Sequence, residues 1–208
     1  MKIKFIIAAI AVLSCTSFAQ ELLTNISWNL GLTANNTEKY IQDVSYRGFS
    51  ISGRRFIDKQ NSIGFATGWN IFDEKINEPI NIQREQGSGV ITGTQIRTIN
   101  SFPLLVGFHH HFGRSDDLRL FLGINTGTYY ILQRLEMGVF IIDNDNWHFG
   151  LAPEAGLIIP VSDDGTGIQF NTRFNYAFDS GTAFGGDENN YYSFWDFGIG
   201  FSFSSGWF

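Results

Sequence analysis

Residues 168–178 read Ile-Gln-Phe-Asn-Thr-Arg-Phe-Asn-Tyr-Ala-Phe, and their side chains alternate in polarity along the whole run. The even positions are mostly apolar and aromatic, and the odd positions carry amides, an arginine and an alanine. Because a β-strand sends successive side chains to opposite faces, the run predicts a strand with one apolar and one polar face. Its length exceeds the roughly 5–6 residues of a usual globular strand and matches the roughly 9–11 residues of a tilted membrane-spanning strand.

Seven further segments alternate in the same way, which predicts eight strands in total. They cover residues 26–34, 44–57, 63–71, a stretch ending at 112, 119–132, 147–161 and 195–203. The predicted connections alternate in length, with long polar ones at 35–46, 73–92, 133–146 and 179–192 and short turns between them. Outer-membrane barrels have this plan, with short periplasmic turns and longer outside loops. The sequence therefore predicts an all-β, eight-stranded antiparallel up-and-down transmembrane β-barrel.

The orientation of the two faces follows from where glycine and aromatic residues lie. In a water-soluble barrel the apolar face would point into a narrow interior and the glycines opposite would face water, where nothing requires a small residue. In a membrane barrel the aromatics contact lipid, and glycines such as Gly150, Gly156 and Gly198 line the tight interior. The second arrangement explains both faces. It predicts that six aromatic side chains face lipid: Phe170, Phe174, Phe178, Trp195, Phe197 and Phe201.

The first residues have the features of a secretory signal peptide. Lys2 and Lys4 precede a short apolar run, and residues 17–19 form a small-x-small site for cleavage before Gln20. We therefore expect a signal peptide at 1–19 and a barrel domain at 20–208. Residues 12–15 also weakly resemble a lipoprotein processing box, which would leave a lipidated Cys15 as the N-terminus.

The composition narrows the class of protein. The net charge is −6, with no basic cluster, so no nucleic-acid partner is expected. The single cysteine lies in the expected leader, which excludes disulfide and thiol chemistry from the mature chain. After residue 20, no apolar run approaches the length of a membrane-spanning helix.

The closing segments resemble a known family. Pro153-Glu154-Ala155-Gly156, the Asp-Asp-Gly turn and the aromatic last strand are similar to the small eight-stranded outer-membrane barrels of Gram-negative bacteria, the OmpA-, OmpX- and opacity-type proteins. This resemblance implies an integral outer-membrane location, contact with outer-membrane lipid and lipopolysaccharide, and insertion by the barrel-assembly machinery. Phe208 resembles the terminal aromatic that this machinery recognises, although Ser204, Ser205 and Gly206 interrupt the apolar register before it.

The polar faces predict a side-chain network in the interior. A two-residue turn at 164–165 would place Glu154 opposite Asn175 and diagonal to Arg173, so that the two charges pair. The expected network consists of Glu154, Arg173, Gln169, Asn171, Asn175 and Asp196, with Arg54, Arg97, His109 and His111 as further inward candidates. Such a network either fills the barrel as a plug or acts as an electrostatic gate for small solutes.

Other chemistry has weaker signals. In residues 109–111, three consecutive histidines point to alternate faces, so they do not converge on a metal. His148 is the histidine best placed for a lipid-modifying enzyme, but no nucleophile elbow accompanies it. The loop acids have no calcium-loop spacing. We expect no catalytic residues, no metal and no cofactor.

The sequence thus predicts an outer-membrane barrel with a structural, adhesion or surface-interaction role and a filled interior, which presents loops to an unknown ligand. The alternatives are a narrow pore or small hydrophobic-solute channel and, less well supported, an outer-membrane lipid-modifying enzyme.

Overall fold

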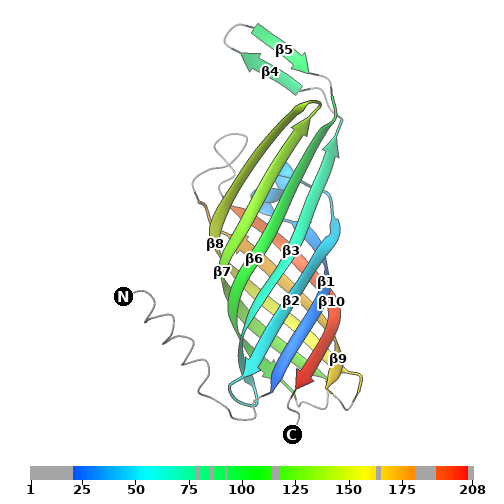
Figure 1. Ribbon diagram of the computed structural model, residues 1–208, viewed down its shortest axis with the longest axis vertical. Coiled ribbons are helices and arrows are strands. Elements are labelled where there is room, and N and C mark those ends of the chain that lie inside the picture. Colours follow the sequence, from blue (N-terminus) through cyan, green and yellow to red (C-terminus); the bar gives the residue numbers. More distant parts are fainter. Residues whose placement is uncertain are drawn as a thin grey trace, which may run out of the picture.

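Eight antiparallel strands close into a barrel in the computed structural model, in the order β1-β10-β9-β8-β7-β6-β3-β2 (Figure 1). The structure describes residues 21–77, 80–84, 87–91, 93–113, 118–162, 165–180 and 191–205. Consecutive barrel strands are neighbours, and β1 pairs with β10 to close the sheet. The predicted all-β, eight-stranded, up-and-down barrel is confirmed.

The barrel strands coincide with the alternating segments of the sequence but most are longer. They are β1 Leu22–Thr33, β2 Ser45–Phe56, β3 Asn61–Ile76, β6 Gln95–Phe112, β7 Arg119–Met137, β8 Phe140–Pro160, β9 Thr166–Ala177 and β10 Tyr192–Ser205. A separate two-stranded sheet, β4 Ile80–Arg84 and β5 Gly87–Ile91, lies within the second long connection. The first long connection contains a short helix, α2 Asn35–Tyr40. Among the described residues, no helix is long and apolar enough to cross a membrane.

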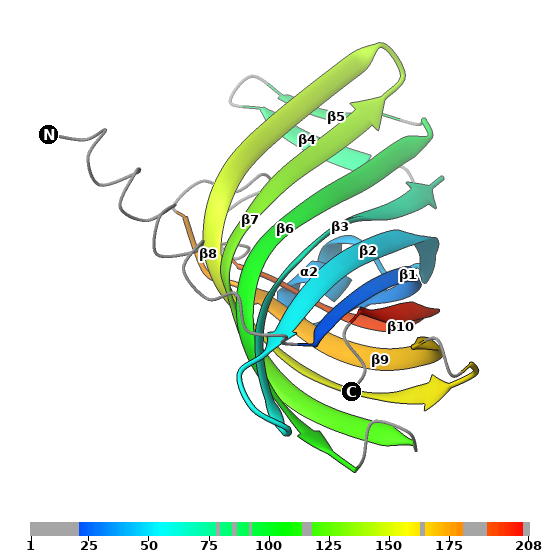
Figure 2. The same ribbon diagram turned by 60° about the horizontal axis from the view of Figure 1, so that its bottom comes forward.

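The strands differ in how far they extend beyond the barrel. β1, β2 and β9 have 12 residues each, whereas β7 has 19 and β8 has 21. Since roughly 9–11 residues span a membrane, the longer strands project well past it. Figures 1 and 2 show β3, β6, β7 and β8 rising above the rim that the other strands form, at the end opposite the C-terminus.

One predicted connection is wrong. Residues 133–146 are not a loop, because β7 continues to Met137 and β8 begins at Phe140, which leaves a turn of only two residues. Gly138 has φ of 60°, and Asn35 is the only described non-glycine residue with positive φ, so Gly138-Val139 matches a type II′ hairpin turn. The apolar residues that follow the turn do not alternate with polar ones, so the sequence pattern did not predict a strand there.

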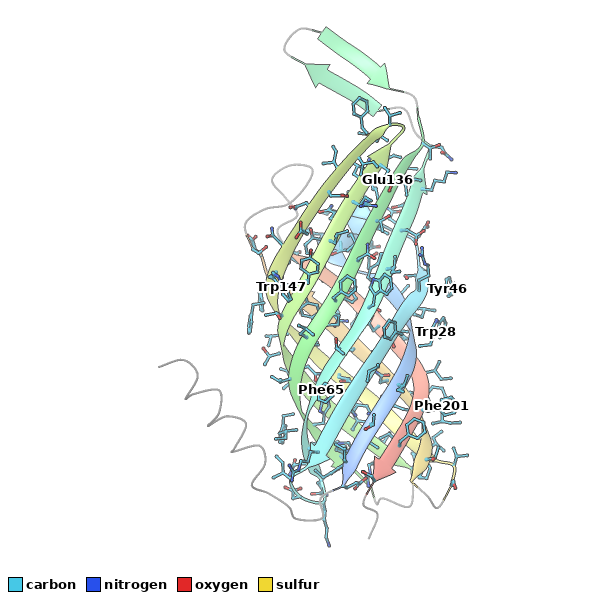
Figure 3. The ribbon with its side chains drawn as sticks, viewed as in Figure 1. Trp28, Tyr46, Phe65, Glu136, Trp147 and Phe201 are labelled. Carbon is cyan, nitrogen blue, oxygen red and sulfur yellow. The ribbon has the colours of Figure 1, made fainter. Side chains whose placement is uncertain are left out.

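The outer wall of the barrel is apolar. Phe65, Leu122 and Phe201 point outward and are each more than half exposed, and Figure 3 shows Phe65 and Phe201 on the outside of the wall. Towards the outer end, Trp69, Phe102, Tyr130 and Trp147 form a continuous row of aromatic contacts across β3, β6, β7 and β8. An apolar wall edged by aromatic side chains is the surface of a barrel that lies in lipid.

The interior is arranged in three layers. An apolar cluster of Leu23, Phe56, Phe121 and Ile158 lies towards the end that carries the short turns. A larger apolar cluster fills the outer end, and it includes Phe72, Phe194, Tyr129 and Ile131 together with Ile41, which directly follows α2. Between these clusters lie buried charged and amide side chains. The interior therefore holds large aromatic residues as well as the glycines and short polar groups that the sequence led us to expect.

Candidate functional site

An ion pair crosses the full width of the barrel. Arg54 on β2 and Glu154 on β8 belong to strands that are four positions apart in the closed sheet, whichever way one counts. Their side chains meet with Nη2 of Arg54 2.8 Å from Oε1 of Glu154, and both are almost fully buried. The Arg54 guanidinium carbon also lies 4.1 Å from the centre of the Phe121 ring, a distance at which the ring face attracts a cation.

Three further side chains bind the Glu154 carboxylate. His109 Nε2 lies 3.2 Å from Oε2, and the Asn125 amide donates to the same oxygen at 3.0 Å. The Asn171 amide donates to Oε1 at 3.2 Å. Because a buried charge is costly unless it is paired and hydrogen-bonded, these contacts explain how Glu154 is accommodated in the interior. They join β2, β6, β7, β8 and β9 through one carboxylate.

A second ion pair lies beside the first. Arg173 Nη2 is 3.0 Å from Oδ2 of Asp196, and both side chains are buried. The same carboxylate oxygen accepts from the Asn175 amide at 2.8 Å and from the Asn70 amide at 3.3 Å. Arg173 and Asp196 are directly opposed on β9 and β10.

The predicted pairing of Glu154 with Arg173 is therefore replaced by two separate pairs. The predicted register was also wrong, because Glu154 lies directly opposite Arg173 and not Asn175. The turn between β8 and β9 is longer than two residues, since the last paired residues are Pro160 and Gly167. The sequence reasoning named Arg54 as inward but did not foresee its contact with Glu154, because the two residues come together only when the barrel closes.

Glycines leave the space that the buried rings occupy. A Cβ atom on Gly123 would lie 2.2 Å from Cδ2 of His109, and one on Gly156 would lie 2.5 Å from Cζ of Phe121. Both distances are shorter than real side chains allow. The absence of side chains at these two positions thus permits His109 to reach Glu154 and Phe121 to lie beneath Arg54.

The remaining inward candidates lie at different levels. Gln169 is buried in the interior. His111 is buried, with its Nε2 atom 2.9 Å from the Ser62 hydroxyl. Arg97 is half-buried near the outer end and donates to the Tyr40 carbonyl at 2.9 Å.

His110 points the other way from His109 and His111, with its Nδ1 atom 2.9 Å from Oδ1 of Asn61. Within the described ranges, no group of three or more His, Cys, Asp or Glu side chains could hold a metal ion.

The residues predicted to face lipid lie on the outer side of their strands. Phe170, Phe178, Trp195, Phe197 and Phe201 are exposed, and Phe174 is half-buried beside Trp195. The predicted assembly signal at Phe208, the leader with Cys15, and the turn residues Asp163 and Asp164 lie outside the described residues.

His148 is buried at the outer end of the barrel, between two chain segments. Its Nδ1 atom lies 2.8 Å from the Phe178 carbonyl oxygen, so this nitrogen carries the proton and donates. Nε2 lies 3.4 Å from the Ser180 hydroxyl, and the ring packs edge-on against Tyr192. The Phe178 carbonyl orients the ring through Nδ1, and the Asp179 carboxylate acts on the ring electrostatically. The contacts tie β8 to the segment that follows β9.

The β7–β8 hairpin beyond the aromatic row is a feature that the sequence reasoning missed. Its end carries consecutive exposed apolar residues, Val139, Phe140, Ile141 and Ile142, and Val139 is 90% exposed. Below them, Arg134 makes a two-pronged contact with Asp143, at 2.7 and 3.0 Å. These bonds from Arg134 hold the pKa of Asp143 below its usual value.

Comparison with known proteins identifies the architecture. No protein-family profile matches the sequence, and no curated protein matches it. Among solved structures, the chain is similar to Neisserial surface protein A, with 12% identity and a TM-score of 0.50 over 89% of this chain and 97% of that one. It is also similar to the outer-membrane protein OprG from Pseudomonas aeruginosa, with 9% identity and a TM-score of 0.50 over 89% of this chain and 96% of that one.

At these identities the likeness establishes the fold, which is that of the small eight-stranded outer-membrane barrels. The apolar outer wall and its aromatic row supply independent evidence that this barrel lies in lipid. The chain is therefore an integral outer-membrane β-barrel.

Proposed function

We propose that this outer-membrane barrel is a closed, non-enzymatic protein. The barrel is the membrane anchor for the elements at its outer end, and its role is to support the envelope or to contact other surfaces. The observation that carries the proposal is the ion pair between Arg54 and Glu154, which spans the interior from one wall to the opposite one. A solute that passed along the axis would have to separate these groups. Separation would leave two buried charges without partners, which is strongly unfavourable.

The layers on either side of this pair support the same proposal. The buried pairs Arg54–Glu154 and Arg173–Asp196 balance in charge, so they leave no excess of one sign to attract ions. Apolar clusters lie above and below this layer. A channel for apolar solutes would need a continuous apolar path, whereas the polar layer interrupts the apolar clusters. The interior thus has the character of a plug and not of a gate.

A non-enzymatic role fits the surroundings of His148. In a Ser-His-Asp triad the Nδ1 atom of the histidine donates to a carboxylate, whereas Nδ1 of His148 donates to the Phe178 carbonyl. The partners that we propose are outer-membrane lipid and lipopolysaccharide, the barrel-assembly machinery and an outside ligand. Residues 1–19 serve in this proposal as the export signal.

Conductance of the refolded protein in a planar lipid bilayer tests the proposal. We expect no conductance steps from the unaltered protein in concentrated KCl. The double variant Arg54→Ser/Glu154→Ser removes both charged groups that cross the interior. It serves as the positive control, because conductance steps from it would show that the assay detects an opened barrel. Regular, voltage-stable conductance steps from the unaltered protein would contradict a closed barrel. Loss of these steps in Ser27→Phe, which adds bulk to the interior, would show that the current passes through the barrel.

A further inference from the structure

The end of the β7–β8 hairpin is apolar on both of its faces. Phe140 and Ile142 follow the side of β8 that faces the interior lower down, whereas Ile141 follows the outward side. Val139 occupies the turn itself. All four are exposed, by 90% for Val139, 64% for Phe140, 61% for Ile141 and 38% for Ile142. We call these residues the apolar tip.

The apolar tip lies away from the membrane that holds the barrel. Trp147 belongs to the aromatic row at the outer edge of the lipid-facing wall. Val139 precedes it by eight residues, which at roughly 3.3 Å per residue is roughly 26 Å along the strand. Figure 3 shows Glu136, the cross-strand neighbour of Ile141, far above Trp147 and Trp28. The barrel's own membrane therefore does not account for these apolar side chains.

Structural needs do not account for them either. The tip needs only a glycine in the turn, and polar side chains at 139–142 would continue the hairpin equally well. Exposed apolar residues in a contiguous group commonly mark an interaction site. The hairpin thus carries its apolar residues beyond the aromatic row, at the end of the molecule where the β4–β5 sheet also lies (Figure 1).

The shape of the tip favours lipid over a protein as that partner. A stable protein interface needs roughly 20–30 residues a side, whereas the tip offers four residues on a convex end. A protein surface would cover one face of the hairpin and leave the other in water. A fluid apolar phase covers both faces at once, and each buried side chain adds to the binding.

The charges beneath the tip indicate which lipid surface it suits. On the hairpin itself, Glu136, Asp143 and Asp145 lie just below the tip, and Arg134, the cation of this part of the hairpin, is held by Asp143 at 2.7 Å and lies 3.8 Å from Glu136. These residues of the hairpin are net negative, and Arg134 is already paired with acidic side chains. Since like charges repel, an anionic membrane is disfavoured and a zwitterionic one is accepted.

We infer that the apolar tip inserts into a zwitterionic phospholipid bilayer other than the one that holds the barrel. This inference rests on the proposed function, because it identifies the surface that the outer end of the anchored barrel contacts. Insertion is driven by apolar burial, so it is insensitive to salt, and the acidic residues below the tip limit its depth.

The experiment uses the barrel in a nanodisc with an environment-sensitive dye on Val139→Cys, since the only natural cysteine is Cys15 in the expected leader. Phosphatidylcholine vesicles are added, and we expect the emission to shift to shorter wavelength. Vesicles with added phosphatidylglycerol should give a smaller shift. The matched control carries the dye on Val161→Cys, which replaces another exposed valine, at the opposite end of the barrel (62% exposed), and should not respond.

A second variant tests the side chains directly. Phe140→Ser/Ile141→Ser should weaken vesicle association by at least about a hundredfold, since each lost side chain is worth about one power of ten or more in binding. Ile57→Ser at a short turn is its control and should have no effect. Unchanged heat-dependent gel mobility of all variants shows that the barrels are folded.

Three results would overturn the inference. The first is no emission shift with any vesicle. The second is a dye already in an apolar environment before vesicles are added, which would place the tip in its own bilayer. The third is association of nanodiscs with one another through the tip without vesicles, which would make a second copy the partner. A conducting barrel that still binds vesicles would contradict the proposed function alone, and a closed barrel that does not bind them would contradict this inference alone.

Discussion

The interior of the barrel and the end of its outer hairpin place side chains in opposite environments, with charged groups buried inside and apolar groups exposed at the hairpin end. Inside, Arg54, Glu154, Arg173 and Asp196 are charged and almost completely buried, and each carboxylate is bound by an arginine and at least two further side chains. At the hairpin end, apolar side chains are exposed without lipid around them. Buried charges with several partners are explained by the structure that they hold together. Exposed apolar side chains are not, and so they point to an interaction.

The two regions also differ in their ion pairs. The interior pair Arg54–Glu154 joins strands on opposite walls, whereas the exposed pair Arg134–Asp143 joins neighbouring positions of one hairpin. Burial makes the loss of one partner costly, and exposure makes it nearly harmless. This contrast can be measured.

The largest effect is expected at the pair that crosses the interior. Arg54→Met leaves the Glu154 charge buried without its arginine, and should lower the free energy of unfolding by about 3–5 kcal/mol. Urea unfolding of the protein in lipid vesicles measures this change. Arg54→Met/Glu154→Leu should recover most of the loss, because an apolar pair leaves no buried charge. Arg55→Met, at the next position on β2 and facing the other way, is the control. A cost for Arg54→Met no larger than for the control would show that the pair does not hold the barrel.

A smaller effect is expected at the second interior pair. Arg173→Met removes a contact between β9 and β10, which the sheet already joins, and leaves Asp196 with the amides of Asn70 and Asn175, so the loss should be about 2–3 kcal/mol. The same unfolding measurement gives the order of the two variants. A greater loss here than at Arg54 would mean that contacts between adjacent strands matter more than the contact across the interior.

The smallest effect is expected at the exposed pair, as a pH dependence. Because the bonds from Arg134 lower the pKa of Asp143, the pair supports the hairpin above the ordinary carboxyl pKa, and the support is lost as pH falls through the lowered value. Hydrogen exchange of the β7 and β8 amides near the pair should quicken over that acidic range, with no change in barrel unfolding. Asp143→Asn should abolish the pH dependence. A change in global unfolding at the same pH would contradict a purely local role.

Much of the barrel could be predicted because its pattern is local. Each strand shows its two faces in its own sequence, so Phe170 and Arg173 could be assigned to opposite sides without knowledge of their neighbours. The hairpin of β7 and β8 was missed because its turn, Gly138-Val139, is followed by three apolar residues that show no alternation, Phe140, Ile141 and Ile142. Gly138 followed by a β-branched and aromatic run was the one available signal for a type II′ turn.

The contacts inside the barrel could not be predicted in the same way. The register between β8 and β9 depended on the length of one turn, and a wrong length displaced Glu154 from its true neighbour by two residues. The partner of Glu154 across the interior, Arg54, is 100 residues away in sequence.

By itself, then, the sequence determined the number of membrane-crossing strands, the side of each strand that contacts lipid and the polar character of the interior. Each of these properties follows from the alternation of side chains within a single strand. Only the tertiary structure decided which charges pair, that one ion pair reaches across the interior from wall to wall, and that an apolar tip lies beyond the aromatic row. The reason is that closure of the sheet sets the distances across the barrel, and no single strand contains that information.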